Sequence, residues 1–332
     1  MTDRKSDHIF MANFNQINSV EKDSRFVYEP ILSGHPGNSL PEVSIGGKTM
    51  KVPIWISSMT GGTKEARKIN RNLAKTAAEF GLGMGLGSCH ALIKDRSSLP
   101  DYDFRSVLGD DLPFYVNLGI AQVEQHLKND GLQTIIDLVN LVKADGLIVH
   151  VNPLQEWLQI EGDRINTPPI DTIKRLLDAA DLNVIVKEVG QGMGMDSLRT
   201  LLKLPLAAIE FGAFGGTNFA RMEIKRNTDY NANLYEPLAF IGQTAEEMVL
   251  DINHLIDHEN IKVKTPALII SGGLNNFLDG YYLMQKSRLP SVYGMASKFL
   301  KYAMIDQQRV NEYTTNQIEG LRMAYAFLKV RI

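Results

Sequence analysis

Cysteine is nearly absent from this sequence, since only Cys89 occurs among 332 residues. A single thiol cannot form an internal disulfide, a thiolate zinc site or an iron–sulfur cluster, and it is typical of a reducing compartment. Long apolar runs are missing too, because none approaches the roughly 20 residues that a membrane-spanning helix needs. The start, Met1 to Phe10, is polar and charged and lacks the apolar centre of a secretion signal. We therefore expect a cytoplasmic protein with no membrane partner.

Neither sign of charge dominates, because 35 basic residues are balanced by 38 acidic ones, for a formal net charge of -3. This balance argues against a general nucleic-acid binder, although a local basic pocket is compatible with it. The residues are 44% hydrophobic, so the chain can bury a large core. Its length would allow two domains, but an α/β barrel of this size is commonly a single domain.

Short runs of β-forming residues alternate with amphipathic helical stretches, the pattern of repeated βα units around a parallel sheet. The expected strands are Ile54–Ser58, Leu82–Leu86, Phe114–Asn117, Gly146–Asn152, Asn183–Val189, Ala208–Phe211, Ala267–Ser271 and Ser291–Ala296. The expected helices are Lys64–Phe80, Leu132–Lys143, Ile170–Ala180, Asp196–Leu202, Ala245–Asp257 and Asn276–Lys286. Eight such units predict a (β/α)8 TIM barrel. An open doubly wound sheet is the alternative, because alternation alone does not distinguish the two.

Three segments fall outside this repeat. Residues 1–50 contain turn formers such as His35-Pro36-Gly37-Asn38, so we expect an irregular amino-terminal cap before a barrel formed by residues 51–332. Residues 215–243, after the sixth strand, form a long polar loop, which in a compact domain is usually a functional lid or disordered. Asp306–Lys329 is expected to form a helical tail.

Polar side chains follow the fourth strand at the point where it ends. His150, Asn152, Gln155 and Glu156 lie within seven positions after an apolar run. Such groups are costly to desolvate, and the active sites of barrels lie at the carboxyl ends of their strands. We therefore expect these side chains to meet a ligand or an ion. The alternative is a strand edge whose polar residues are simply solvated.

The fifth strand carries a lysine, Lys187, inside an apolar run. A buried ammonium group is unfavourable unless it meets an anion or an electron-rich ring. Strand lysines can also extend to solvent or form an ion pair. Glu188 is the nearest partner for such a pair, but alternate residues of a strand point to opposite faces. We favour an inward, functional Lys187.

Glycine-rich turns follow the last two strands, at Ser271-Gly272-Gly273 and at Gly294-Met295-Ala296-Ser297, and each precedes a helix. In a barrel these two turns usually form a phosphate-binding corner, so they suggest a phosphate-bearing cofactor. Gly61-Gly62 after the first strand is explained equally well by a plain turn. No nucleotide-binding fingerprint of the Walker or dinucleotide type is present.

Taken together, these motifs resemble type 2 isopentenyl diphosphate isomerase, the flavin-dependent enzyme of isoprenoid biosynthesis. The similarity covers almost the whole chain. It is carried by Arg4-Lys5 with His8, Met59-Thr60-Gly61-Gly62, His150-Val151-Asn152, Gln155-Glu156, Glu161-Gly162-Asp163, Val186-Lys187-Glu188-Val189-Gly190, Gly215-Gly216-Thr217-Asn218 and Ser271-Gly272-Gly273.

The resemblance implies interconversion of isopentenyl and dimethylallyl diphosphate, with reduced FMN as acid/base, Mg²⁺ on Glu156 and NADPH as reductant. FMN would contact Ser58, Met59, Thr60, Ser88, Asn117, Lys187, Thr217, Gly273, Leu274, Asn275, Ala296 and Ser297. Substrate would contact Arg4, Lys5, Ser88, Cys89, His90, His150, Asn152 and Gln155. The catalytic residues would be Gln155, Lys187 and His150. A homo-oligomer (a tetramer or an octamer) is implied, in which residues 1–50 contribute to the substrate site.

The chain departs from the family pattern at three places. Cys89-His90 stands where Gln-Arg is usual, Asn275 where an arginine is usual, and Gly212 where a serine is usual. Arginine offers a permanent, bidentate charge to phosphate, which histidine and asparagine do not. The loss predicts weaker binding, an altered substrate, or a compensating basic residue from the long loop: Arg221, Lys225 or Arg226.

Three other interpretations remain. An FMN oxidoreductase of the 2-hydroxyacid oxidase or glutamate synthase type shares the barrel. Such an enzyme ordinarily has a His-Arg pair late in the barrel or cysteines that bind an iron–sulfur cluster, and we find neither in this sequence. A flavin- or phosphate-binding protein without isomerase activity is compatible with His90 and Asn275. A scaffold without any ligand would leave Lys187 and Glu156 unexplained.

Overall fold

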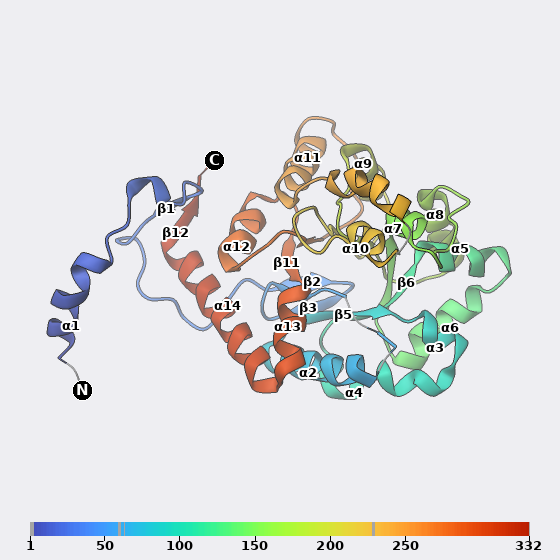
Figure 1. The fold of residues 1–332 in the computed structure, drawn as a ribbon, viewed down its shortest axis with the longest axis horizontal. Coiled ribbons are helices and arrows are strands. Elements are labelled where there is room, and N and C mark those ends of the chain that lie inside the picture. The colour runs from blue at the N-terminus through green and yellow to red at the C-terminus, as the bar shows by residue number, and fades with distance from the viewer. Residues whose placement is uncertain (1–2, 59–60, 63, 228–229, 332) are drawn as a thin grey trace.

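A closed barrel of eight parallel strands forms the centre of the molecule (Figure 1). The computed structural model describes residues 3–58, 61–62, 64–227 and 230–331. The barrel strands are β4 (Ile54–Ile56), β5 (Gly83–Ser88), β6 (Phe114–Gly119), β7 (Gly146–Val151), β8 (Val184–Glu188), β9 (Ala208–Glu210), β10 (Leu268–Ser271) and β11 (Ser291–Met295). Each lies within or overlaps one of the eight expected runs, and β11 pairs with β4 to close the sheet. The predicted (β/α)8 barrel is confirmed, and the open sheet is excluded.

Helices surround this barrel and connect its strands. The α-helices after the first strand are α2 (Lys64–Phe80), α3 (His90–Lys94), α4 (Arg105–Leu108), α5 (Ile120–Lys128), α6 (Leu132–Val142), α7 (Pro153–Leu158), α8 (Pro169–Ala179), α9 (Met195–Leu202), α10 (Phe219–Arg226), α11 (Ala245–Asp257), α12 (Phe277–Lys286), α13 (Ser297–Ile305) and α14 (Gln307–Phe327). Two 3-10 segments, η3 (Arg96–Asp101) and η4 (Tyr230–Phe240), lie among them. All six expected helices form, and the helical tail is α14.

The helix ends follow the chemistry of their caps. Thr244 accepts the amide N–H of Glu247, and the Glu247 carboxylate accepts the amide N–H of Thr244, so α11 begins with a reciprocal capping box. On α2 the apolar stripe that includes Leu73 and Ala77 is buried against the barrel. The helices thus bury one face each, which is why their 3.6-residue periodicity is visible in the sequence.

A β-hairpin plugs the amino-terminal end of the barrel. It consists of β2 (Val43–Ile45) and β3 (Lys48–Met50), and its Ile45 and Met50 are fully buried with Trp55 and Tyr115. Apolar side chains therefore fill that end of the barrel, and the candidate site lies at the opposite end, where the strands reach their carboxyl termini.

The first fifty residues contain more regular structure than the irregular cap we expected. The strand β1 (Phe26–Tyr28) pairs antiparallel with β12 (Leu328–Val330), so the two ends of the chain form one ribbon. Before it lie α1 (Arg4–Met11), η1 (Ala12–Phe14) and η2 (Ser19–Glu21). Figure 1 shows α1 standing well away from the barrel, and none of its residues is buried. No helix in the described ranges is long and apolar enough to cross a membrane.

Candidate active site

Three polar side chains form a row across neighbouring barrel strands. His150 on β7 is the register partner of Lys187 on β8, and Lys187 is the register partner of Glu210 on β9. Register partners on adjacent strands point to the same face of a sheet, so these side chains lie side by side. An imidazole, an ammonium and a carboxyl group therefore meet inside the barrel.

His150 is held as a neutral imidazole. Its Nδ1 lies 2.6 Å from Oδ1 of Asn117 on β6, an oxygen that can only accept, so Nδ1 carries the proton. Burial, together with the nearby charge of Lys187, lowers the pKa of His150 to about 3. At neutral pH the ring is therefore uncharged, and its Nε2 is a hydrogen-bond acceptor.

Lys187 points into the barrel, as we predicted. Its Nζ donates to the carbonyl oxygen of Glu188 at 3.2 Å and lies 3.9 Å from Oε1 of Glu210. The Glu188 carboxylate points elsewhere, because its Oε2 accepts the backbone N–H groups of Gly190, Gln191 and Gly192. The adjacent acid on the same strand is thus not the ion-pair partner of Lys187.

A cavity of about 290 Å³ opens beside Lys187 at the carboxyl ends of the strands. Its lining includes eight of the residues that the resemblance assigned to FMN: Ser58, Lys187, Thr217, Gly273, Leu274, Asn275, Ala296 and Ser297. A second cavity of about 150 Å³ shares Ser58 and Lys187 with the first. Its lining adds Ser88, Asn117, His150 and Gln155. The fold therefore brings ten of the twelve expected FMN residues to one hollow, but only three of the eight expected substrate residues: Ser88, His150 and Gln155. Asn152 and Glu156 line neither cavity.

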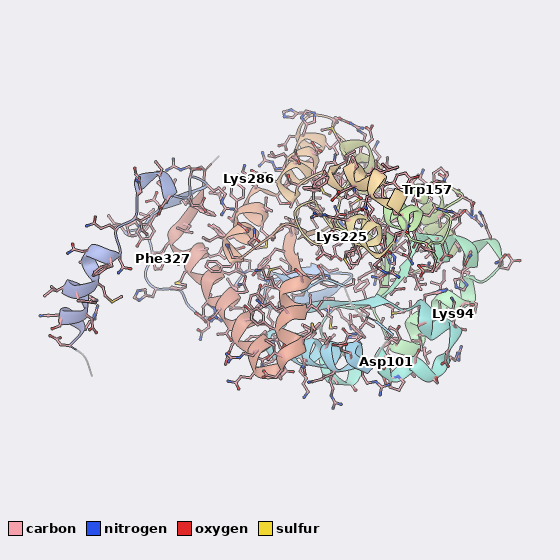
Figure 2. All side chains as sticks on the ribbon, in the orientation of Figure 1. Lys94, Asp101, Trp157, Lys225, Lys286 and Phe327 are labelled. Carbon is pink, nitrogen blue, oxygen red and sulfur yellow. The ribbon has the colours of Figure 1, made fainter. Side chains whose placement is uncertain are left out.

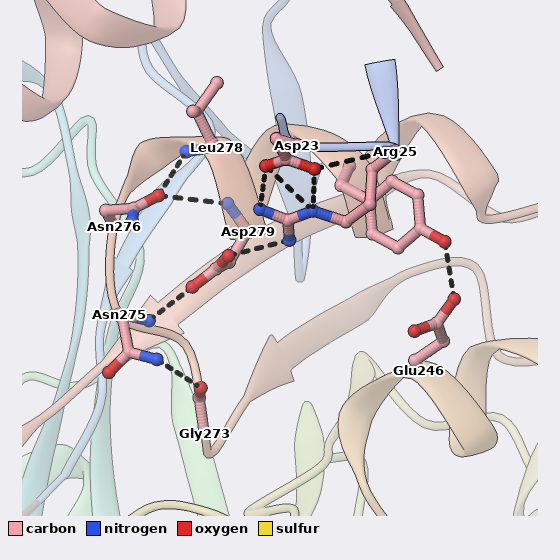
Figure 3. Close-up of polar contacts among 9 residues, drawn as sticks. Asp23, Arg25, Glu246, Gly273, Asn275, Asn276, Leu278 and Asp279 are labelled. Carbon is pink, nitrogen blue, oxygen red and sulfur yellow. Dashed lines mark hydrogen bonds and ion pairs between the residues drawn. The ribbon is translucent and has the colours of Figure 1, made fainter. Parts of the chain in front are cut away.

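The two glycine-rich turns after β10 and β11 differ in how many amides they leave available. At the start of α12, the side chain of Asn276 accepts the N–H groups of Leu278 and Asp279, and the Asp279 carboxylate accepts the N–H of Asn275 (Figure 3). At the start of α13, Ala296 provides no side-chain cap. The backbone amides in the first turn of α13 can therefore bind an anion, and the dipole of α13 favours a negative charge at that end.

Glycine is required at two positions around this hollow. A Cβ atom on Gly272, whose φ is +92°, would lie 2.1 Å from the carbonyl oxygen of Ala213. A Cβ atom on Gly212, whose φ is +52°, would lie 1.9 Å from the carbonyl oxygen of Glu188. The serine that the family usually has at the second position would clash with this backbone, so the departure at Gly212 matches the local path of the chain.

Glu156 lies buried at the start of α7, and both of its carboxylate oxygens are bound. Oε1 accepts from Nδ2 of Asn152 at 3.0 Å, and Oε2 accepts the N–H of Asp163 at 2.8 Å. The same Asn152 nitrogen donates to Oε1 of Gln155 at 3.0 Å. These bonds fix Asn152, Gln155 and Glu156 as a unit. Among the described residues no three His, Cys, Asp or Glu side chains gather as a metal cluster.

The Ser88-Cys89-His90 segment contributes only in part. Ser88 lines the smaller cavity. The Cys89 side chain is fully buried, its thiol donates to the carbonyl oxygen of Gly87, and burial raises the thiol pKa to about 12. Its backbone N–H donates to the carbonyl oxygen of Asn117, and Cys89 lines neither cavity. His90 begins α3, and burial together with Lys94 lowers its pKa.

Other expected residues lie apart from the hollow or outside the described part of the chain. Arg4 and Lys5 belong to the exposed α1, distant from the barrel of their own chain (Figure 1). Met59 and Thr60 are outside the described residues.

The basic residues of the long loop do not supply the missing charge in this structure. Arg221 lies 3.8 Å from Glu236, and Arg226 is paired with Glu223 at 2.6 Å and lies 3.7 Å from Glu161. Lys225 is exposed on α10 (Figure 2). In the described part of the chain, none of the three basic residues lines either cavity.

Sequence reasoning missed two charged residues here. Lys298, in the first turn of α13, lines the larger cavity next to the glycine-rich turn after β11. Glu210, on β9, is fully buried beside Lys187. Both carried a signal: Lys298 directly follows the phosphate turn, and Glu210 interrupts an apolar strand as Lys187 does.

Comparison with known proteins identifies the family. No family model matches the chain. The isopentenyl-diphosphate delta-isomerase of Rickettsia akari is 32% identical over 329 residues, which cover 96% of this chain and 91% of that protein. The protein of the same name from a Synechocystis strain is 33% identical over 328 residues, which cover 97% of this chain and 90% of its own. The chain belongs to the isopentenyl-diphosphate delta-isomerase family. The resemblance to this family is therefore confirmed.

Solved structures share the architecture at low sequence identity. A flavocytochrome b2 mutant with pyruvate bound has a TM-score of 0.63 at 12% identity, over 90% of this chain and 71% of that chain. A mandelate oxidase mutant with an FMN adduct has a TM-score of 0.56 at 11% identity, over 92% and 88% of the two chains. At this identity the likeness establishes the barrel fold alone.

Proposed function

We propose that the protein interconverts isopentenyl and dimethylallyl diphosphate, using FMN in its reduced form, Mg²⁺ for the diphosphate and NADPH as the reductant. The observation that carries this proposal is the shared hollow, in which phosphate-binding turns adjoin the His150–Lys187 row in a chain of this family. The reaction adds a proton at the terminal alkene carbon and removes one from carbon two.

The residues of the larger cavity suit FMN. Turns without Cβ atoms let a phosphate approach the backbone, and the uncapped start of α13 offers amides to it. Ser58 Oγ is buried without a hydrogen-bond partner among the described residues, so a polar ring edge would satisfy it. Reduced flavin supplies the acid/base chemistry that an alkene requires, while the protein supplies position and electrostatics.

Two lysines of the larger cavity then have a defined task on the cofactor side. Lys187 places a positive charge against the ring and stabilises its anionic form. Lys298 adds a charge at the phosphate corner, where Asn275 cannot, since asparagine is neutral and its backbone N–H is bound to Asp279. One exposed ammonium group beside a phosphate dianion adds a modest electrostatic attraction to the binding of the phosphate.

On the substrate side, the neutral His150 and the fixed Asn152–Gln155–Glu156 unit would hold the diphosphate. Mg²⁺ is usually held by one or two carboxylates together with waters and substrate phosphates. Glu156 would be that carboxylate, through the lone pairs that its bonds from Asn152 and Asp163 leave free. The buried Oδ1 of Asn152 has no partner among the described residues and offers a further oxygen. Gln155, which lines the smaller cavity, would orient the carbon chain.

We further propose that the active protein is a homo-oligomer in which Arg4 and Lys5 of a neighbouring copy reach the diphosphate. The amino-terminal segment of one chain exposes several large apolar side chains, including Ile9, Phe10, Phe14 and Ile17. An apolar, unpartnered segment of this kind is expected to be covered by another subunit.

One experiment separates this function from the oxidase alternative. Protein reconstituted with FMN is given isopentenyl diphosphate with Mg²⁺ and reductant under anaerobic conditions, and separately a 2-hydroxy acid under oxygen. We expect dimethylallyl diphosphate in the first reaction and no oxygen consumption in the second. In the described part of the chain no arginine lines either cavity to receive a 2-hydroxy acid carboxylate. Oxygen consumption without isomerisation would reverse the assignment.

A further inference from the structure

Glu210 is the most deeply buried charged side chain beside the proposed flavin cavity, and no step described above uses it. Its exposed fraction is 0%, and it lies on β9 with its side chain next to Lys187. Carboxyl groups are almost never fully buried unless they are paired. The position therefore calls for a reason.

The Glu210 carboxylate contacts residues of both strands that flank β9: Lys187 on β8 and Ser271 on β10. Oε1 lies 3.9 Å from the Lys187 ammonium and accepts from Oγ of Ser271 at 3.4 Å. Oε2 is buried without a hydrogen-bond partner among the described residues, and so are Ser57 Oγ and Trp55 Nε1. Burial raises the pKa of Glu210, and the positive charge of Lys187 counteracts part of that rise.

The groups that face Lys187 leave Glu210 as its only acidic neighbour among the described residues of the adjacent strands. From β7 it meets His150, which is neutral. On its own strand the Glu188 carboxylate accepts backbone amides, so it attracts Lys187 electrostatically without pairing with it. From β9 it meets Glu210. Lys187 is only 8% exposed, and burying an ammonium group is unfavourable without an opposite charge beside it.

We propose that Glu210 is a positioning residue for Lys187. Its carboxylate keeps the Lys187 ammonium group charged and directed at the flavin ring. Removing the carboxylate leaves the amine in a buried site that disfavours its charged form. An opposite charge at this distance typically moves such an equilibrium by about one to three pH units, which is tenfold or more in the fraction of neutral amine.

Competitive labelling of the flavin-free protein tests this directly. Only a neutral amine reacts with acetic anhydride, and peptide mass spectrometry gives the rate at Lys187 relative to the exposed Lys301 as an internal standard. We expect Glu210→Gln to raise the relative rate at Lys187 about tenfold or more. Glu210→Asp, which keeps the charge, should restore most of the slow rate.

A matched control separates lost charge from general loosening. Glu124 on α5 is also buried, with an exposed fraction of 2%, but it pairs with Lys128 outside the barrel. Glu124→Gln should leave the rate at Lys187 unchanged. An unchanged rate at Lys187 in Glu210→Gln, or an equal rise in Glu124→Gln, overturns the proposal.

Stability gives a second measurement, which remains available if Glu210→Gln folds poorly. Lys187→Met leaves the Glu210 carboxylate without its cation, so the double variant Lys187→Met/Glu210→Gln should unfold at a higher temperature than Lys187→Met alone. A double variant that is no more stable than Lys187→Met contradicts the pairing.

A third measurement, the midpoint potential of bound FMN, rests on the proposed function and is interpreted separately from the other two. If FMN binds, Glu210→Gln should lower its midpoint potential towards that of Lys187→Met, and the double variant should match Lys187→Met. A potential in Glu210→Gln at or above that of the unsubstituted protein refutes the positioning role. Faster labelling of Lys187 in Glu210→Gln, in a protein that does not bind FMN, would instead support the Glu210–Lys187 pair and refute the proposed function.

Discussion

Lys298 provides a prediction whose size follows from the structure. It is exposed in the first turn of α13 and lines the phosphate corner of the larger cavity. Among the ion pairs of the described residues none involves Lys298, so its charge is available to a ligand. We expect Lys298→Met to weaken the binding of FMN because the variant removes one positive charge beside the phosphate.

The magnitude follows from Coulomb's law in a solvated setting. Two unit charges about 4 Å apart attract by about 1 kcal/mol in water, and a phosphate carries nearly two charges. Salt screening reduces this, so the loss should be about 1 to 2 kcal/mol, or roughly tenfold in Kd. Riboflavin has the same ring but no phosphate, so its affinity should not change.

The assay is quenching of flavin fluorescence on titration with protein, for FMN and for riboflavin. Lys301→Met serves as the control, because Lys301 lies on the same helix but lines neither cavity of the described residues. The reasoning fails if Lys298→Met weakens the binding of FMN and riboflavin equally. It also fails if Lys298→Met leaves FMN affinity unchanged while Lys301→Met lowers FMN affinity.

Three further predictions concern the substrate side, the backbone and pH. Glu156→Gln and Gln155→Asn should cut turnover by more than tenfold with an unchanged flavin spectrum, and unchanged turnover in both would refute their roles. Gly212→Ser should lower the free energy of unfolding by about 1 to 3 kcal/mol or more, measured by urea denaturation, because φ is +52° and Cβ would meet Glu188. His150 has a lowered folded-state pKa, so the unfolded chain binds more protons below about pH 6.5 and stability falls with acid by up to about 1.4 kcal/mol per pH unit. Urea denaturation at pH 7 and pH 5 should therefore show a smaller acid loss for His150→Gln than for the unsubstituted protein, and equal losses would contradict the buried neutral imidazole.

The barrel could be predicted because its signals are local. Each strand is an apolar run, and several of them end in the polar or glycine-rich turns that the carboxyl face of a barrel requires. Lys187 was predictable for the same reason, since one charge inside an apolar strand is visible without any long-range information. Glu210 gives the same signal within a shorter strand, and alternation on β9 would have revealed it.

The amino-terminal segment could not be predicted in this way. The pairing of β1 with β12 joins residues that are about three hundred positions apart, and short strands carry little signal of their own. Arg25 next to β1 pairs with Asp279 on α12, whose other oxygen accepts the N–H of Asn275 (Figure 3). The amino-terminal segment thus buttresses a turn of the candidate site through a contact that no local pattern encodes.

Cys89 shows a different limit of sequence reasoning: its motif position suggests a contact with substrate, while the structure directs its side chain into the core. The segment lies at the end of the second barrel strand, so a side chain there can point to the hollow or to the core. A small thiol is compatible with the core, and the structure buries it there. Position along the strand end does not determine which direction is taken.

The most direct test of the central claim is the fate of a solvent proton. Protein with reduced FMN and Mg²⁺ is incubated anaerobically in D₂O with isopentenyl diphosphate, and the product is analysed by NMR. We expect dimethylallyl diphosphate with deuterium in its newly formed methyl group, and none when FMN is left oxidised. Absence of product from flavin-loaded, reduced protein, or equal conversion without any flavin, would contradict the account.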